Sequence, residues 1–282
     1  MNLTDRIYLA VHVALTVLVC LRYDLFPHWP WYVVWNALAI IAIVVLSRKR
    51  HDGPGWEFAH DWLPALFFIT VFEEVSFLSL ALRGEWQNPV LIAWESALFA
   101  LPPGEWLRHV SAPWFAELLA FGYFSFYPLY PAVAGVFWAW RRRPQFSGAF
   151  RRLTDALSIG YLICYATYLL FPIRSPSHNV GLETVATTQS GGPFRFLVRV
   201  IQGSAGVHGN AFPSSHIMLA FAVLVFVFRY FPRLAPWILI CVLLMSIGAV
   251  YDGYHYAVDV IAGAGLGVAV GTAFVARKKA SS

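Results

Sequence analysis

Two short polar motifs lie within otherwise apolar stretches of this 282-residue chain. The first is Pro213-Ser214-Ser215-His216 and the second is His255-Tyr256-Ala257-Val258-Asp259. Histidine, serine and aspartate can supply a nucleophile, hydrogen-bond donors and an acid, which are the parts that phosphoryl transfer requires. The two motifs therefore predict one active site assembled from distant parts of the chain.

The first motif is typical of the start of a helix. Proline is favoured at the first helical position, where its missing N–H would have no partner. We therefore expect Pro213 at that position, followed by Ser214, Ser215 and His216 in the first turn. Their N–H groups, at the positive end of the helix dipole, would point at a bound anion. Serine-capped helix starts are common, so this motif alone is weak evidence for a phosphate site.

The second motif is more specific, because His255 and Asp259 are four residues apart and would stack on one helix face. The carboxylate would hold the imidazole in one tautomer and leave the other ring nitrogen free to attack. A polar pair at membrane depth is costly, which favours a functional role over a satisfied pair at a helix end. A metal site of His216, His255 and Asp259 is the alternative. An arginine such as Arg174 beside it would oppose a cation, and no fourth ligand recurs at a diagnostic spacing.

Composition indicates the environment of these motifs. Hydrophobic residues make up 59% of the chain and charged residues 12%, and the mean hydropathy is +0.62. Soluble domains carry about 25% charged residues, so this chain is predicted to be an integral membrane protein. Its three cysteines lie in apolar runs without paired spacing, which predicts neither disulfides nor a thiolate metal site.

The elements that must position the motifs are apolar segments long enough to be transmembrane helices. We expect an all-α polytopic fold with about eight such helices. They are predicted at residues 7–23, 31–47, 61–82, 114–140, 153–172, 213–231, 235–250 and 254–275.

Lysine and arginine residues concentrate in alternate connections between these segments, near residues 48–50, 141–152, 229–233 and 277–279. Cytoplasmic loops retain an excess of such residues, so both termini are predicted to be cytoplasmic. Both motifs would then face the periplasmic or extracytoplasmic side. The net charge of +5 is read as a topology signal, and a nucleic-acid partner is not expected.

Two predicted outer stretches are long. Residues 83–113 carry several tryptophans, which suits an amphipathic segment in the headgroup layer, either an interface anchor or a lid over the site. Residues 173–212 lead into the first motif and begin beside the outer end of the fifth span. They contain Arg174, Arg195, Arg199 and His208.

Two adjacent carboxylates, Glu73 and Glu74, fall inside the third apolar run, where charge is costly. We expect an ion pair or a helix–helix hydrogen bond, or alternatively a supporting role beside Arg174, His255 or an acceptor hydroxyl. The residues predicted to support the site are thus Glu73, Glu74, Arg195, Arg199, His208 and Tyr251.

The chain resembles the type-2 phosphatidic acid phosphatase superfamily. The resemblance rests on Phe171-Pro172-Ile173-Arg174-Ser175-Pro176, on Ala211-Phe212-Pro213-Ser214-Ser215-His216, and on the run from His255 to Gly263. These motifs look most like the branch related to inositol phosphorylceramide synthases, the inositolphosphotransferases. The resemblance covers about residues 60–275. It suggests two added N-terminal helices with a basic loop in residues 1–59 and a six-helix catalytic domain in residues 60–282.

The resemblance implies a role for each motif residue. His255 would be the nucleophile that forms a phosphohistidine, Asp259 would orient it, and His216 would be the general acid and later the general base. The phosphate would be bound by Arg174 and by the N–H groups of Ser214 and Ser215. The implied mechanism needs no metal and no organic cofactor.

Two positions depart from the pattern of this superfamily. A lysine seven residues before the first arginine is replaced by Thr167, and an arginine six residues before the catalytic histidine is replaced by Ala249. Loss of two cations suits a phosphodiester, which carries one negative charge, better than a monoester dianion. We therefore favour transfer of a phospho-headgroup between membrane lipids, unless Arg195, Arg199 or His208 replaces the missing charge.

Two other functions remain open at this stage. The first is a lipid phosphate or isoprenoid diphosphate phosphatase, which would use water as the acceptor. The second is a catalytically silent scaffold or transporter, which the intact His216, His255 and Asp259 disfavour. The sequence sets neither the headgroup and tail of the lipid nor the oligomeric state.

Overall fold

The computed structural model describes residues 1–26, 28–109, 112–178, 192–205 and 210–276. Within these ranges every regular element is a helix, so the all-α expectation is confirmed. The long helices of the bundle are α1 (Leu3–Leu21), α2 (Trp29–Lys49), α3 (Pro54–Arg83), α6 (Pro113–Ala139), α7 (Ala149–Leu170), α10 (Ser215–Tyr230), α11 (Ala235–Tyr251) and α12 (Ala257–Val275). The shorter α-helices of the described ranges are α4 (Asn88–Leu98), α5 (Pro103–Arg108) and α9 (Pro193–Ala205).

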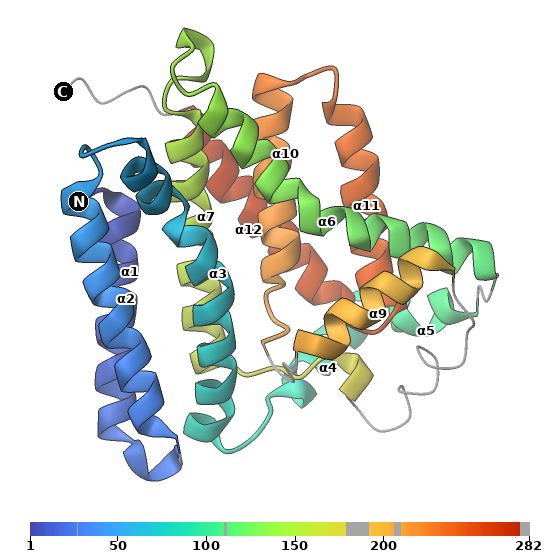
Figure 1. Ribbon diagram of the computed structural model, residues 1–282. Helices are drawn as coiled ribbons and strands as arrows, with labels where there is room; N and C mark the ends of the chain where they lie inside the picture. Colours follow the sequence, from blue (N-terminus) through green and yellow to red (C-terminus); the bar gives the residue numbers. More distant parts are fainter. Residues whose placement is uncertain (27, 110–111, 179–191, 206–209, 277–282) are drawn as a thin grey trace.

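Among the described residues, five helical stretches are long and apolar enough to cross a membrane, and they indicate a multi-pass membrane protein. They are α1, α2, α3, residues 144–170 including α7, and α12. Helices α10 and α11 are apolar but have only 16 and 17 residues. Helix α6 forms where a span is predicted, but it runs obliquely across the others in Figure 1. The count of eight spans therefore stays a prediction.

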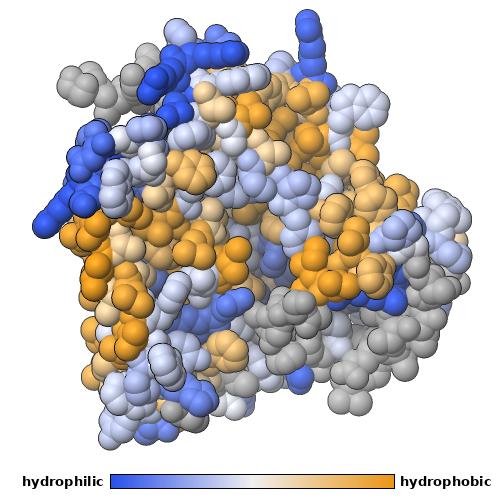
Figure 2. Space-filling model, in the orientation of Figure 1, coloured by the Kyte–Doolittle hydropathy of each residue, from blue (hydrophilic) through white to orange (hydrophobic). Residues whose placement is uncertain are grey.

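The arrangement in space gathers the basic connections at one end of the bundle. The N-terminus and the α2–α3, α6–α7 and α10–α11 connections lie at the upper end in Figure 1, and the α1–α2 turn lies at the opposite end. Figure 2 shows hydrophilic side chains at that upper end and an apolar flank below it. Exposed side chains such as Ile41, Ile69 and Phe77 belong to the apolar surface of the spans.

The two helices that carry the motifs, α10 and α12, pack at very short distance. A Cβ atom on Gly263 would lie 2.5 Å from the carbonyl oxygen of Ser214, so only glycine fits there. The N–H of Ser214 in turn donates to the carbonyl oxygen of Asp259 (3.2 Å). The starts of both helices are therefore held against one another.

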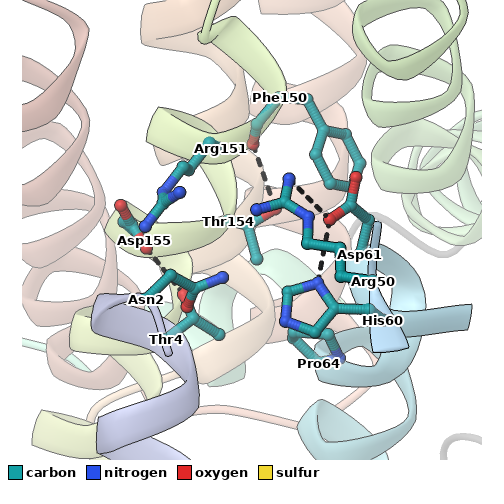
Figure 3. A pocket seen from close by; sticks show the side chains of 10 residues that line it. All are labelled: Asn2, Thr4, Arg50, His60, Asp61, Pro64, Phe150, Arg151, Thr154 and Asp155. Atoms are coloured by element: carbon teal, nitrogen blue, oxygen red, sulfur yellow. Dashed lines mark hydrogen bonds and ion pairs between the residues drawn. The ribbon is translucent and has the colours of Figure 1, made fainter. Parts of the chain in front are cut away.

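The helices α1 and α2 attach to the remainder through polar groups as well as apolar packing. At the basic end, the ring of His60 lies between two carboxylates, with Nε2 3.1 Å from Asp5 and Nδ1 3.1 Å from Asp61. Arg50 pairs with Asp61 at 3.1 Å, and Thr4 donates to Asp155 of α7 at 2.7 Å. Figure 3 shows most of this cluster around a small cavity.

Candidate active site

Backbone hydrogen bonds bring the three predicted motif segments together. The N–H of Ala211 donates to the carbonyl oxygen of Ile173 (3.1 Å), which joins the segment after α7 to the segment before α10. The carbonyl oxygen of Ala211 faces Nδ1 of His255 at 3.1 Å. Ser177 N–H donates to the carbonyl oxygen of Gly253 at 2.8 Å. Three separate stretches of chain thus form one site.

His255 does not lie on a helix, which corrects the expected stacking of His255 and Asp259. Helix α12 begins at Ala257, and Asp259 in its first turn accepts the N–H of Tyr256 (2.8 Å). This capping contact ends the helix before His255 is reached. The Asp259 carboxylate still lies 3.5 Å from Nδ1 of His255, because the preceding chain folds back over the helix end. The pair forms through a turn instead of through helical spacing.

The surroundings of His255 select one tautomer. A carbonyl oxygen only accepts, so Nδ1 carries the proton and donates to Ala211. Nε2 then presents a lone pair and lies 3.0 Å from the hydroxyl oxygen of Ser214. Burial lowers the pKa of His255 to about 4, against the opposing effect of the Ala211 hydrogen bond. The ring is therefore neutral at physiological pH, as a nitrogen nucleophile must be.

Helix α10 begins two residues later than expected. Ser214 is its N-cap, with its hydroxyl oxygen accepting the N–H of Ile217 (3.4 Å), and Pro213 precedes the cap. A serine hydroxyl can accept such an N–H, which proline cannot do, so the cap falls on the serine. The Ser214 N–H is already donated to Asp259, and the Tyr168 hydroxyl is hydrogen-bonded to Ser215, so the N–H of His216 is the donor of this helix end that we expect to meet an anion.

His216 lies close to His255, as the motifs predict. The two ring centroids are 6.4 Å apart. The His216 ring also packs edge-on against Phe126 of α6 at 4.9 Å and against Phe72 of α3 at 6.0 Å. The two histidine rings therefore lie near one another at the N-terminus of α10.

Arg174 is held in place through its backbone. Its N–H donates to the side-chain oxygen of Asn88 (2.9 Å), and its carbonyl oxygen accepts from the Asn88 amide (2.8 Å). The same amide donates to the hydroxyl of Tyr256 at 3.1 Å. The guanidinium Nε of Arg174 is buried without a hydrogen-bond partner within the described part of the chain. Asn88 was not predicted as a site residue, because its role depends on contacts with segments far away in sequence.

Glu95 is a second site residue that the sequence analysis missed. It is 4% exposed, and its two carboxylate oxygens accept the N–H groups of Ala257 (3.2 Å) and Val258 (3.1 Å). Glu95 thus caps α12 from another helix and occupies the anion site at that helix end. A carboxylate within an apolar segment is the sequence signal that would have drawn attention to it. The predicted anion site lies at the N-terminus of α10 instead.

A pocket of about 180 Å³ adjoins His255. It lies between α4, the segment around α5 and the start of α12, and its polar lining includes Glu95, Ser96 and Glu105. Residues 83–113, expected to form an amphipathic surface segment, therefore fold into two helices that reach the site. Their tryptophans Trp94 and Trp106 remain exposed.

Glu73 and Glu74 of α3 point in different directions, as neighbouring positions on a helix must. Glu74 is buried and accepts from Asn36 of α2 (2.7 Å), whose side-chain oxygen lies 2.5 Å from Nδ1 of His12. The expected helix–helix hydrogen bond is thus confirmed for Glu74. Glu73 is exposed on the outer face of the same helix.

The other residues predicted to support the site differ in burial and in their partners. Arg195 of α9 is buried and pairs with Asp252 (3.3 Å), whereas Arg199 is exposed. Tyr251 is buried against Phe115 of α6, with ring centroids 5.7 Å apart. His208 lies outside the described residues. No group of three or more His, Cys, Asp and Glu side chains that could hold a metal ion occurs among the residues described.

The two positions that lack the expected cations have local roles. Thr167 donates its hydroxyl to the carbonyl oxygen of Ile163 within α7 (2.8 Å). Ala249 is fully buried, and its carbonyl oxygen accepts the N–H of His255 (3.0 Å). Neither position brings charge to the site.

Comparison with known proteins agrees with this site. The model of the PAP2 superfamily matches residues 89–273, and the chain belongs to this superfamily. A PA-phosphatase related-family protein of Dictyostelium discoideum is 32% identical over 105 residues, which cover 36% of this chain and 19% of that protein. No solved structure matches the chain. Membership of the superfamily suggests a phosphatase or phosphotransferase that acts on lipid phosphates.

Proposed function

We propose that this protein is a membrane enzyme that transfers a phosphoryl-containing group from a lipid phosphoester through a phosphohistidine on His255. The observation that carries the proposal is the tautomer of that residue. The Ala211 carbonyl holds the proton on Nδ1, so the lone pair of Nε2 faces Ser214 at the open N-terminus of α10. A neutral nitrogen beside a helix N-terminus is suited to attack phosphorus.

The reaction consists of two displacements. In the first, Nε2 of His255 attacks phosphorus, the bond to the leaving oxygen breaks, and His216 donates a proton to that oxygen. In the second, an acceptor hydroxyl gives its proton to His216 and attacks phosphorus, and the nitrogen–phosphorus bond breaks. Arg174 and the N–H groups at the start of α10 stabilise the charge on the phosphoryl oxygens in both steps.

Charge at the site favours transfer of a phosphodiester headgroup, as in an inositol phosphorylceramide synthase, over hydrolysis of a monoester. Thr167 and Ala249 contribute no cation. Two carboxylates, Glu95 and Asp259, lie at the neighbouring end of α12. A site with so little net positive charge binds a monoanion with less penalty than a dianion.

We further propose that the site faces the outer side of the membrane, with the N-terminus inside. The basic connections gather at one end of the bundle, and cytoplasmic loops retain such residues. Residues 60–282 would then form the catalytic domain, with α1 and α2 as an addition.

The proposal is tested by trapping phosphate on the purified protein. With radiolabelled lipid substrate, we expect acid-labile label on the wild-type protein and none on His255→Ala. His216→Ala should retain the nucleophile and lose at least about 100-fold in turnover, because general acid catalysis contributes 10²–10⁴-fold. His51→Ala, at the opposite end of the bundle, is the matched control.

Two results would contradict this assignment. Near-native turnover by His255→Ala would remove this residue as nucleophile, and the same result for His216→Ala would remove the acid. Rapid release of free phosphate without transfer to an added lipid alcohol would show that the protein is a phosphatase and not a transferase.

A further inference from the structure

Arg195 is a buried arginine that contacts the loop carrying the proposed nucleophile His255. It is 4% exposed, and its Nη2 donates to Asp252 at 3.3 Å. Asp252 follows α11 and precedes His255 by three residues. Helix α9 therefore places a guanidinium against the same connection that presents the catalytic histidine.

The position of Arg195 is fixed from two sides. The Glu117 carboxylate of α6 accepts the N–H groups of Phe194 (2.7 Å) and Arg195 (3.3 Å), and so caps the start of α9. The ring of Phe194 packs against Phe121 of α6 at 5.1 Å. Farther along the same helix, Phe126 packs against His216. One helix thus supports both the arginine and the acid–base histidine.

One arm of this guanidinium is left without a partner. Nη1 is buried and has no hydrogen-bond acceptor within the described residues, whereas Nη2 is taken by Asp252. A buried charged donor without an acceptor is costly, so such a group is expected to meet an acceptor in the functional state. Phosphate oxygens are the acceptors that the planar arginine fork binds best.

We propose that Nη1 of Arg195 binds a non-bridging phosphate oxygen of the substrate while Asp252 holds Nη2. This inference rests on the proposed function. Asp252 offsets the charge of Arg195, so the pair adds a directed donor without adding net charge. The pair therefore supplies a hydrogen-bond donor for phosphate in a site where Thr167 and Ala249 stand in place of the lysine and arginine of the superfamily pattern. Because the pair is neutral overall, the site stays suited to a phosphodiester monoanion.

The first test measures binding of orthovanadate, a phosphate mimic, to the purified full-length protein. Arg195→Gln should weaken vanadate inhibition about 10- to 100-fold, which corresponds to the loss of one hydrogen bond to a charged group. Arg195→Lys should lose less, because it keeps the charge but not the fork. Arg229→Gln, exposed at the far end of α10, is the matched control and should change inhibition less than about twofold.

The second test separates phosphate binding from a structural pair. Asp252→Asn keeps Arg195 and adds net positive charge, so it should preserve vanadate binding and raise the ratio of monoester to diester turnover. If Arg195→Gln and Asp252→Asn weaken vanadate binding equally, and the double variant is no worse, the pair is structural and the inference is wrong. Phosphohistidine formation in wild type with unchanged vanadate inhibition in Arg195→Gln also overturns it while leaving the proposed function intact. Wild type that neither binds vanadate nor forms phosphohistidine overturns both.

Discussion

At the scale of single residues, the proposed nucleophile His255 is a buried ring with no strong base among the described residues within hydrogen-bonding distance of its Nδ1. Its proton is held by a backbone carbonyl at 3.1 Å, and Asp259 is more distant at 3.5 Å. The carbonyl sets the tautomer, while in the proposed mechanism the carboxylate stabilises the positive charge that develops when Nε2 attacks. Orientation and neutrality therefore come from the fold around the ring.

A prediction at this scale concerns pH. His255 attacks only when neutral, and burial lowers its pKa to about 4, so protonation removes the nucleophile only as pH falls through about 4. Single-turnover phosphohistidine formation should be measured between pH 3.5 and 8 with a p-nitrophenyl phosphodiester, whose leaving group needs no general acid. An acidic limb centred near 6.5, the ordinary histidine value, would show that the ring is not desolvated in this way.

At the scale of elements, the N-termini of α10 and α12 differ in what occupies them. The end of α12 is closed by Glu95, which accepts two of its N–H groups, and by Asp259, which accepts the N–H of Tyr256. The end of α10 is capped only by its own Ser214, and it is the end at which we propose that the phosphate binds. Close packing at Gly263 holds the two ends at a fixed separation.

Glu95 should therefore act by positioning α12. Glu95→Ala leaves two buried N–H groups without acceptors, at a cost of about 1–3 kcal/mol each, so we expect a lower unfolding temperature and at least a tenfold loss of kcat. Glu95→Gln, which keeps one acceptor, should fall between this variant and wild type. The measurements are thermal unfolding in detergent and turnover, with the exposed Glu85→Ala as control. Normal stability with normal kcat in Glu95→Ala would refute the capping role.

At the scale of the whole molecule, α1 and α2 are joined to the rest by two polar groups at different depths. One is the chain from His12 through Asn36 to Glu74, and the other is the cluster around His60 in Figure 3. In the described part of the chain, no hydrogen bond joins either group to His216 or His255. Both instead specify which face of α3 the added helices cover, since polar groups buried among apolar side chains are costly unless paired.

Asn36→Leu tests whether the polar contacts of α1 and α2 serve packing and not catalysis. It removes the partner of Glu74 and of His12, so we expect the free energy of unfolding to fall by about 2–3 kcal/mol. Phosphohistidine formation on the folded fraction should remain within about twofold of wild type, because the site is elsewhere. Thr272→Leu, which removes an exposed hydroxyl bonded within α12, is the control for a polar-to-apolar change. Loss of phosphohistidine without loss of stability would show that the added helices take part in catalysis.

The sequence by itself determined the membrane environment, the helices and the residues of the three motifs, because hydropathy and residue type are local properties. Only the tertiary structure decided that His255 lies in a turn, that Asn88 and Glu95 brace the motifs, and that Arg195 meets Asp252. In a membrane protein, lipid-facing and buried residues are both apolar, so hydropathy does not tell which helix faces meet. The polar contacts that complete the site depend on that packing.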